Sequence, residues 1–235
     1  MTTEALFRQD AYLRQCEARI THIDETGIRL DRTVFYPLGG GQAGDAGELV
    51  LVDGTRLAIA DTRKSKHEGA TPEGQHDVLA RLSVGDIVQA EIDWARRFRH
   101  MRFHTASHLM CAVLPHPVDG CSITTEYARL DFVTNEPIER EAVEAGLAAL
   151  VAAARPVAID SISDDEMAAR PELVRTMSVK PPVGLGRVRL VRIEGIDLQP
   201  CGGTHVANTA EIGALRVAKI EKKTSRTRRV VLAFA

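Results

Sequence analysis

The sequence predicts an α+β protein in two parts: a small β-barrel over residues 1–93, and helices packed on an antiparallel sheet over residues 94–235. Two observations carry this prediction. The first part alternates polar and apolar residues in short runs between turn signals, a pattern typical of a barrel or sandwich. The second part opens with a long segment without glycine or proline, then mixes helix-like and strand-like segments.

Turn signals divide the first part into antiparallel strands. Residues 12–37 alternate around a turn at residues 24–27, and residues 82–94 contain a turn at Gly85–Asp86. Residues 47–62 alternate around Asp53–Gly54, a strong two-residue hairpin signal. Several short strands at this spacing indicate a small β-barrel or sandwich.

The second part begins with a predicted helix over residues 95–114, which ends before Pro115. Pro137 is expected in the first turn of a second, alanine-rich helix, and Ser163 is expected to cap a short third helix. Predicted strands fill much of the remainder, at residues 120–133, 156–163 and 186–235. This mixture indicates helices packed on a sheet.

Composition sets limits on function. The chain of 235 residues is 44% hydrophobic and 26% charged, an ordinary globular composition, and its net charge of −2 gives no overall basic field. Four cysteines without C-x-x-C spacing argue against a disulfide framework and leave metal binding or nucleophilic catalysis as roles for any important thiol. Without an apolar run of membrane-spanning length or a signal-peptide pattern, a soluble cytoplasmic protein is expected.

The stretch "RFHTASHLM" places His104 and His108 four residues apart on the first predicted helix. Residues at this spacing share one helix face, so both imidazoles can reach a single metal ion. Chance pairs at this spacing are common, and core histidines are the alternative. Thr105 stands where a metalloprotease of the H-E-x-x-H type carries its glutamate, which argues against that class.

A second motif, "QPCGGTH", adds Cys201 and His205 in a glycine-rich turn. One cysteine and three histidines suit tetrahedral zinc, so we predict one Zn²⁺ ion. Four protein ligands would leave no open position, and the sequence does not decide whether the metal is catalytic or structural.

The two motifs together resemble the editing domain of alanyl-tRNA synthetase and its free-standing relatives, the medium-length AlaX-type editing proteins. "FYPLGGGQAGDAGEL", "DWARRFRHMRFHTASHLM", "SVKPPVGLGRVRLVRI" and "CGGTHVANTAEIG" carry the resemblance through both halves of the chain. It implies an N-terminal barrel, a zinc-binding editing domain, and hydrolysis of the ester that joins a wrong amino acid to alanine tRNA. Serine is the expected amino acid, with glycine as a second.

The resemblance also suggests which side chains contact the substrate. Thr105, Ser122 and Thr124 are candidates for reading the serine hydroxyl, although each hydroxyl could simply bind backbone. The glycine stretch Gly39, Gly40 and Gly41 is expected to face the editing pocket, with Gln42 and Asp45 as its important polar side chains. A mobile turn is the alternative for these glycines.

Basic residues beside both motifs predict salt-sensitive binding of the tRNA acceptor end. Arg102 lies near the histidine pair, and Arg228 and Arg229 lie near the C-terminus. A solvated charged face is the alternative for these clusters. Asp131 is expected to be a solvated or strand-end carboxylate. No membrane contact and no obligate protein partner are expected.

Two other functions stay open from the sequence. One is removal of serine from threonine tRNA, because threonyl-tRNA synthetase carries a related domain. The other is a zinc-stabilised RNA-binding module without hydrolase activity, since zinc ligands serve structure as well as catalysis.

Overall fold

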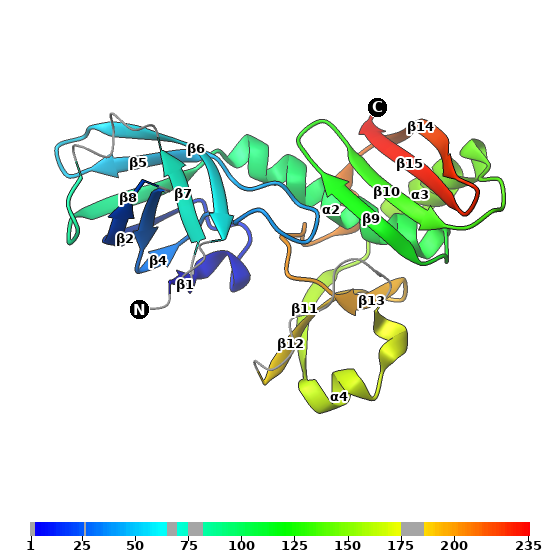
Figure 1. Ribbon diagram of the computed structural model, residues 1–235. Coiled ribbons are helices and arrows are strands. Elements are labelled where there is room, and N and C mark those ends of the chain that lie inside the picture. The colour runs from blue at the N-terminus through cyan, green and yellow to red at the C-terminus, as the bar shows by residue number, and fades with distance from the viewer. Residues whose placement is uncertain (1–2, 26, 65–69, 75–81, 175–185) are drawn as a thin grey trace. The chain divides into compact units, whose positions relative to one another are not determined.

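The computed structural model describes residues 3–25, 27–64, 70–74, 82–174 and 186–235. The chain forms two compact units: unit 1 comprises residues 1–39 and 43–99, and unit 2 comprises residues 40–42 and 100–235. Both are rich in strands, and the predicted mixture of α-helices and antiparallel strands is confirmed (Figure 1).

Unit 1 contains a six-stranded antiparallel sheet in the order β3-β2-β8-β5-β6-β7, which curls around its apolar side chains (Figure 1). Its strands are β2 (Gln15–Asp24), β3 (Gly27–Leu30), β5 (Gly47–Leu51), β6 (Arg56–Lys64), β7 (Ala70–Gly74) and β8 (Ile87–Ile92). The short strands β1 (Glu4–Ala5) and β4 (Arg32–Thr33) pair in parallel. The predicted hairpins β2–β3 and β5–β6 are both confirmed.

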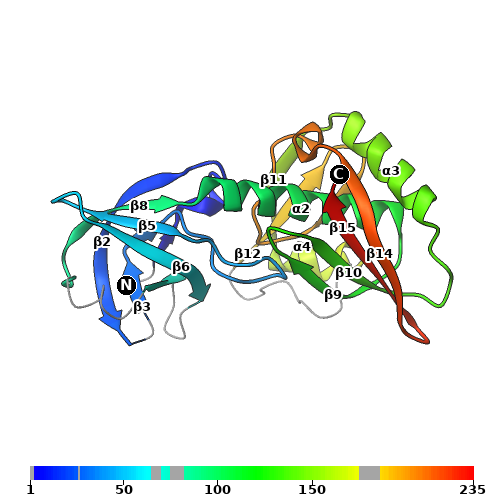
Figure 2. The same ribbon diagram turned by 90° about the horizontal axis from the view of Figure 1, so that it is seen from above.

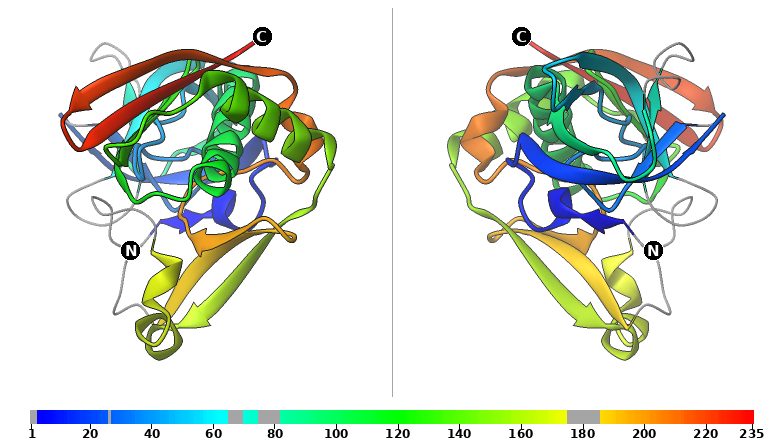
Figure 3. Two further views of the ribbon diagram at one scale, coloured as in Figure 1. Left: turned by 90° about the vertical axis from the view of Figure 1, so that its right-hand side faces the viewer. Right: turned by 90° about the vertical axis from the view of Figure 1, so that its left-hand side faces the viewer.

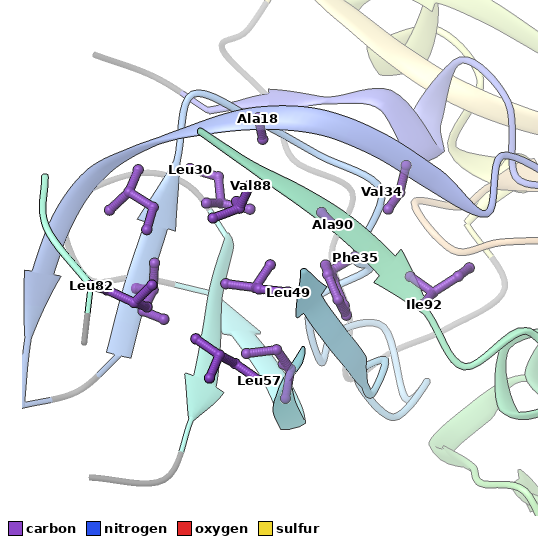
Figure 4. Close-up of a cluster of buried hydrophobic side chains, with 13 residues drawn as sticks. Ala18, Leu30, Val34, Phe35, Leu49, Leu57, Leu82, Val88, Ala90 and Ile92 are labelled. Atoms are coloured by element: carbon purple, nitrogen blue, oxygen red, sulfur yellow. The ribbon is translucent and has the colours of Figure 1, made fainter. Parts of the chain in front are cut away.

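Alternation along the strands builds the core of unit 1. Val88, Ala90 and Ile92 of β8 point inward, whereas the residues between them are partly exposed. Figure 4 shows these side chains with Leu49 and Phe35 in one apolar cluster. The strands β2, β3, β5, β6 and β8 therefore each contribute side chains to this core.

A buried ion pair joins the glycine-rich segment to the first helix, α2 (Trp94–Val113). The carboxylate of Asp45 accepts from Nε and Nη2 of Arg97 and from the backbone N–H of Tyr36, and both charged side chains are fully buried. Arg97 also donates to the carbonyls of Ala11 and Val34. Burial raises the pKa of Asp45, and the charge of Arg97 opposes this rise. Asp45 thus links the glycine-rich segment to α2 inside unit 1.

The main sheet of unit 2 is antiparallel, with the order β14-β15-β10-β9. Its strands are β9 (Val118–Ile123), β10 (Ala128–Val133), β14 (Leu215–Thr224) and β15 (Thr227–Phe234). The helix α3 (Arg140–Ala152) lies along β14 (Figure 2). It buries Val143 and Leu147. This layer agrees with the predicted packing of a helix on a sheet.

A smaller antiparallel sheet contains β11 (Val157–Ser163), β12 (Arg187–Ile193) and β13 (Asp197–Pro200). The short helix α4 (Asp164–Ala168) contacts β11 and β12 (Figure 3). As predicted, Ser163 caps this helix: its hydroxyl accepts from the N–H of Glu166, and the Glu166 carboxylate accepts from the N–H of Ser163. Residues 178–185 of the motif "SVKPPVGLGRVRLVRI" lie outside the described residues.

The predicted position of Pro137 is wrong. The helix α3 begins at Arg140, and its first backbone hydrogen bond joins Val143 to Glu139. Thr134 provides the reason, because its hydroxyl accepts from the N–H of Glu136 and holds the chain in a turn after β10. The helix can start only beyond this turn. The first predicted helix is confirmed, since α2 covers almost the same residues.

Among the described residues, none of the helices combines the length and apolar character needed to cross a membrane.

The Asp45–Arg97 pair gives a stability prediction. In the variant Arg97→Met, a buried carboxylate loses its cation, and the free energy of unfolding should fall by about 3–5 kcal/mol. The double variant Asp45→Asn/Arg97→Met removes the orphaned charge and keeps an acceptor for Tyr36, so it should recover part of the loss. Denaturant unfolding measures both variants. A single variant as stable as the wild type would contradict the assigned role.

Candidate metal centre

Four side chains from two distant segments of unit 2 converge on one point. The helix α2 presents His104 and His108 one turn apart, and the loop after β13 presents Cys201 and His205. Their ligand atoms all lie within 4.8 Å of one another. The three histidines are 4–5% exposed. The structure therefore brings together the four predicted ligands in a largely buried cluster that can hold one metal ion.

The distances within the cluster fit metal coordination. The Sγ atom of Cys201 lies 3.4 Å from Nε2 of His104 and 3.3 Å from Nε2 of His205. Bonds of about 2.0–2.3 Å in tetrahedral geometry separate neighbouring donor atoms by roughly 3.3–3.6 Å. These two separations match those of neighbouring ligands around one small ion.

Each histidine is oriented by a different partner at its other ring nitrogen. The Nδ1 pairs are His104 with Oε1 of Gln42 (2.7 Å), His108 with Oδ2 of Asp197 (3.0 Å) and His205 with Oγ1 of Thr105 (3.1 Å). A ring whose Nδ1–H is donated outward must present Nε2 as the metal-binding atom. The partners are an amide, a carboxylate and a hydroxyl, so three different chemical groups orient the three rings in the same way.

The hydroxyl of Thr105 is fully used inside the protein. It donates to the carbonyl of Met101 (3.0 Å) and accepts from Nδ1 of His205 and from the N–H of Val206 (3.2 Å). A hydroxyl has one donor and two acceptor sites, so this set saturates it. Its side chain is completely buried. The geometry supports a role in holding His205.

Gln42 is equally well fixed. Its Nε2 donates to Oγ1 of Thr204 (2.9 Å), and its Oε1 accepts from the N–H of Thr204 (3.2 Å) as well as from His104. Its backbone forms a parallel bridge with Ile123 of β9. Gln42 is fully buried. The glycine-rich motif thus contributes one residue directly to the surroundings of the metal ligands.

The ionisation of the cluster favours a metal-binding thiolate. Burial raises the pKa of Cys201, but the imidazoles of His104 and His205 lower it more, so its net pKa is well below the usual value. Burial lowers the pKa of His205. Burial also lowers the pKa of His108, but hydrogen bonds with Asp197 and Cys201 raise it more, to about 9. A divalent ion requires the thiolate together with neutral imidazoles, so its binding would release the proton of His108.

Cys121, rather than Ser122, points towards the metal centre. Burial, followed by the nearby charge of Cys201, raises the pKa of the Cys121 thiol to about 12. Successive side chains of a strand point to opposite faces, so Ser122 lies on the other face, opposite Arg129 in the register of β9 and β10. Thr124 follows β9, where its hydroxyl accepts from two backbone N–H groups of the β9–β10 turn.

The three predicted glycines are not equivalent. Gly39 belongs to unit 1, whereas Gly40 and Gly41 belong to unit 2 and have φ values of +59° and +84°. The carbonyl of Gly41 accepts from the N–H of Ile123, and a Cβ atom at this position would lie 3.0 Å from Cys121. A glycine at 41 is therefore needed both for its backbone angles and for the close approach to β9.

The three predicted tRNA-binding arginines lie in different environments. Arg102 donates to the carbonyl of Ile212 and packs 3.8 Å from the ring centroid of Phe234. Arg228 and Arg229 are neighbours on β15, so strand alternation points them to opposite faces of the sheet. One face therefore cannot present both. Arg228 bonds to backbone carbonyls, including that of Asn135.

The expectation that Asp131 is solvated or at a strand end is wrong. It lies within β10, with a side chain only 1% exposed, and contacts Arg129, Lys223 and Arg229. Burial raises its pKa, but hydrogen bonds from Arg229 and Lys223 lower it more, to about 2. Asp131 is therefore an ionised carboxylate at neutral pH.

Comparisons with known proteins give matches to tRNA synthetase families in both units of the chain. Residues 188–231 match the family described as threonyl and alanyl tRNA synthetase second additional domain, and residues 3–96 match class II (A) tRNA synthetases. The chain is 34% identical to the alanyl-tRNA editing protein AlaX-M of Methanosarcina barkeri, over 97% of each chain. The AlaX-M protein of Methanosarcina mazei is 35% identical, over 97% of this chain and 95% of the relative.

The chain belongs to the AlaX-M family of alanyl-tRNA editing proteins. It also resembles the alanine–tRNA ligase of Metallosphaera sedula, with 37% identity over 94% of this chain but only 25% of the ligase. The cluster of three histidines and one cysteine therefore belongs to a chain that matches these two AlaX-M proteins over 95–97% of their length.

Some residues around the metal centre were missed from the sequence. Asp197 and Gln199 are buried polar residues just before the C-G-G-T-H motif, and the buried Thr204 lies within it. Nε2 of Gln199 donates to the same Oδ2 atom of Asp197 that binds His108 (2.7 Å). The available signal was the polar alternation "DLQ" before Cys201, which suits a strand with one face on a polar site.

Two adjacent glycines of the motif give a matched pair of variants. A Cβ atom at Gly203 would lie 2.1 Å from Cε1 and 2.3 Å from Nδ1 of His104, whereas nothing lies within 4 Å of one at Gly202. We expect Gly203→Ala to displace the imidazole and weaken metal binding by at least tenfold, the lower end of losses typical of disturbed ligand surroundings. Gly202→Ala should bind metal like the wild type.

Competition with a chromophoric chelator measures both affinities. Equal metal binding by the two variants would contradict the close packing of the Gly203 backbone against His104.

Proposed function

We propose that the protein is a trans-editing hydrolase that deacylates mischarged alanine tRNA, with serine-charged and glycine-charged alanine tRNA as substrates. One observation carries the proposal: a buried cluster of three histidines and one cysteine occurs in a chain that matches AlaX-M editing proteins almost from end to end. Hydrolysis adds water to the ester carbonyl and breaks its bond to the terminal ribose, whose oxygen takes a proton.

Discrimination between amino acids explains the need for such an enzyme. A site built for alanine cannot strongly reject glycine, which lacks a methyl group, or serine, which adds one hydroxyl. A second site that binds the serine hydroxyl sorts in the opposite sense, because alanine would leave its polar groups without partners. The editing site therefore corrects an error that the first site cannot avoid.

We propose zinc as the metal, held by His104, His108, Cys201 and His205. The borderline-soft donor set and the donor separations support this identity. When bound, the ion would polarise the ester carbonyl and lower the pKa of a water molecule. The protein's own contribution is orientation: Gln42, Asp197 and Thr105 fix the three rings, and their burial excludes bulk water.

Of the three hydroxyls predicted to read the substrate, Thr124 fits that role best. The Thr105 hydroxyl is saturated, and Ser122 lies on the opposite face from Cys121. Thr124 directly follows Ile123, whose backbone bridges to Gln42. Its hydroxyl accepts from the N–H groups of Glu126 and Tyr127 and donates to the carbonyl of Tyr127 over 3.5 Å, against 3.0 Å for the donor bond of Thr105. A serine hydroxyl would need to displace only this long donor bond of a partly buried side chain.

We propose further that residues 1–93 form a barrel domain and residues 94–235 the hydrolytic domain. Contact between β3 and β7, the first and last strands of the six-stranded sheet, supports closure into a barrel. The glycine-rich segment would then connect barrel and editing site.

A second candidate is the removal of serine from threonine tRNA. The matched family of residues 188–231 includes threonyl as well as alanyl enzymes. The two candidates share the ester chemistry and differ only in the tRNA that is recognised.

A deacylation assay tests the proposal. Alanine tRNA charged with serine, glycine or alanine, and threonine tRNA charged with serine, are incubated with protein before and after chelation. We expect rapid release of serine from alanine tRNA, little release of alanine, and loss of activity on metal removal that added Zn²⁺ restores.

Three outcomes would contradict parts of this account. Preference for threonine tRNA would favour the second candidate. Full activity without metal would exclude a metal requirement. Binding of alanine tRNA without hydrolysis would indicate an RNA-binding module.

A further inference from the structure

One face of the main sheet in unit 2 carries three cations around a single buried carboxylate. Asp131 accepts from Arg229 (Nε to Oδ1, 2.7 Å), Lys223 (Nζ to Oδ2, 2.9 Å) and Arg129 (Nη1 to Oδ2, 3.2 Å). The cationic side chains are 25%, 42% and 26% exposed, against 1% for Asp131. We call these four residues the Asp131 cluster.

The strand register builds this cluster. Asp131 lies directly opposite Arg229 on β15, and Arg129 lies two residues earlier on the same face of β10. On the other side, Asp131 lies opposite Gly120 of β9, where a Cβ atom would be 3.1 Å from Oδ2. A residue larger than glycine at position 120 would therefore crowd the carboxylate of Asp131. In the space that Gly120 leaves open, this carboxylate holds the three cations in a fixed arrangement.

Neutralisation of Asp131 does not account for three cations. One carboxylate offsets one positive charge. Glu221 lies opposite Arg229 on β14 but forms an ion pair with Lys219 (2.5 Å), so Lys219 and Glu221 offset each other and the cluster keeps an excess of two positive charges. Each arginine has five N–H donors and the lysine has three, more than two carboxylate oxygens can accept. A cluster that served the sheet alone would need one cation. The excess charge on fixed, partly exposed donors suits a partner with several anionic oxygens.

The cluster lies next to the metal centre across a single strand. β9 is an edge strand of the sheet, and its neighbouring residues Cys121 and Ser122 point to opposite faces. Ser122 is opposite Arg129 on the cluster's face. Cys121 faces the side of the metal centre, where the charge of Cys201 affects it. A chain bound on the cluster's face would therefore lie one strand away from the side of the sheet that Cys121 and the metal ligands share.

We propose that the Asp131 cluster binds the phosphate backbone of the RNA close to its acylated 3′ end, with Arg229 and Lys223 as contacts and Asp131 as the positioning residue. This inference rests on the proposed function. Arg228 is not part of this surface, because its side chain points to the opposite face of β15. The RNA would approach from the face of Arg129 and present its ester on the side of the sheet that Cys121 faces.

The salt dependence of binding to uncharged alanine tRNA tests the proposal without requiring hydrolysis. The variants are Lys223→Gln, Arg229→Gln and their combination. The control is Arg216→Gln, which removes an equal charge from an exposed position on the neighbouring strand β14. Each lost phosphate contact should reduce the slope of log affinity against log salt by about 0.7–0.9. The double variant should therefore lose about twice as much, and the control should keep the wild-type slope.

Metal content, thermal unfolding and kcat at saturating tRNA are measured on the same proteins. We expect metal content and kcat like the wild type and a raised KM in the cluster variants. Wild-type affinity and slope in the double variant would overturn the proposal, as would an equal loss in Arg216→Gln. Lys223 is the most exposed of the three cations, so its variant keeps the test valid if Arg229→Gln is unstable. Absence of deacylation with normal salt-sensitive binding would instead refute the proposed function.

Discussion

Three imidazoles and one thiol share a largely buried volume in which all donor atoms lie within 4.8 Å of one another. Buried polar groups without hydrogen-bond partners cost free energy. Each imidazole ring therefore needs a partner for Nδ1 on its outer side, away from the cluster, and a partner for Nε2 on its inner side, within the cluster. The outer partners come from three segments: Gln42 before β5, Thr105 on α2 itself, and Asp197 at the start of β13. A shared metal ion would be the partner on the inner side.

This constraint explains the glycines around the site. Gly203 lets the loop after β13 contact the His104 ring, and Gly41 lets the chain approach β9 so that Gln42 reaches the same ring. The glycine-rich motif therefore serves both units with different residues: Gln42 belongs to the metal centre, and Asp45 belongs to the buried ion pair of unit 1.

Much of this arrangement could be predicted from the sequence, because local signals determine it. Hairpins, the helix α2 and the cap at Ser163 all depend on residues close in the chain, as does each ligand motif taken by itself. The pairing of the two distant motifs was predicted from the chemistry of their donor atoms and from the resemblance to editing domains. The direction of a side chain on a strand depends on register, which the sequence did not reveal. For that reason the sequence groups Arg228 with Arg229, predicts a solvated or strand-end Asp131, and does not show on which face Ser122 lies. Asp197 was missed because its role appears only when β13 meets α2.

The central claim is that His104, His108, Cys201 and His205 bind one ion together. Titration with Co²⁺, which reports its coordination by visible absorption, tests this claim most directly. We predict one Co²⁺ per chain, with the intense d–d bands of tetrahedral geometry and a thiolate charge-transfer band that Cys201→Ser abolishes. Weak octahedral bands without a thiolate contribution, or saturation at a stoichiometry other than one, would contradict the account.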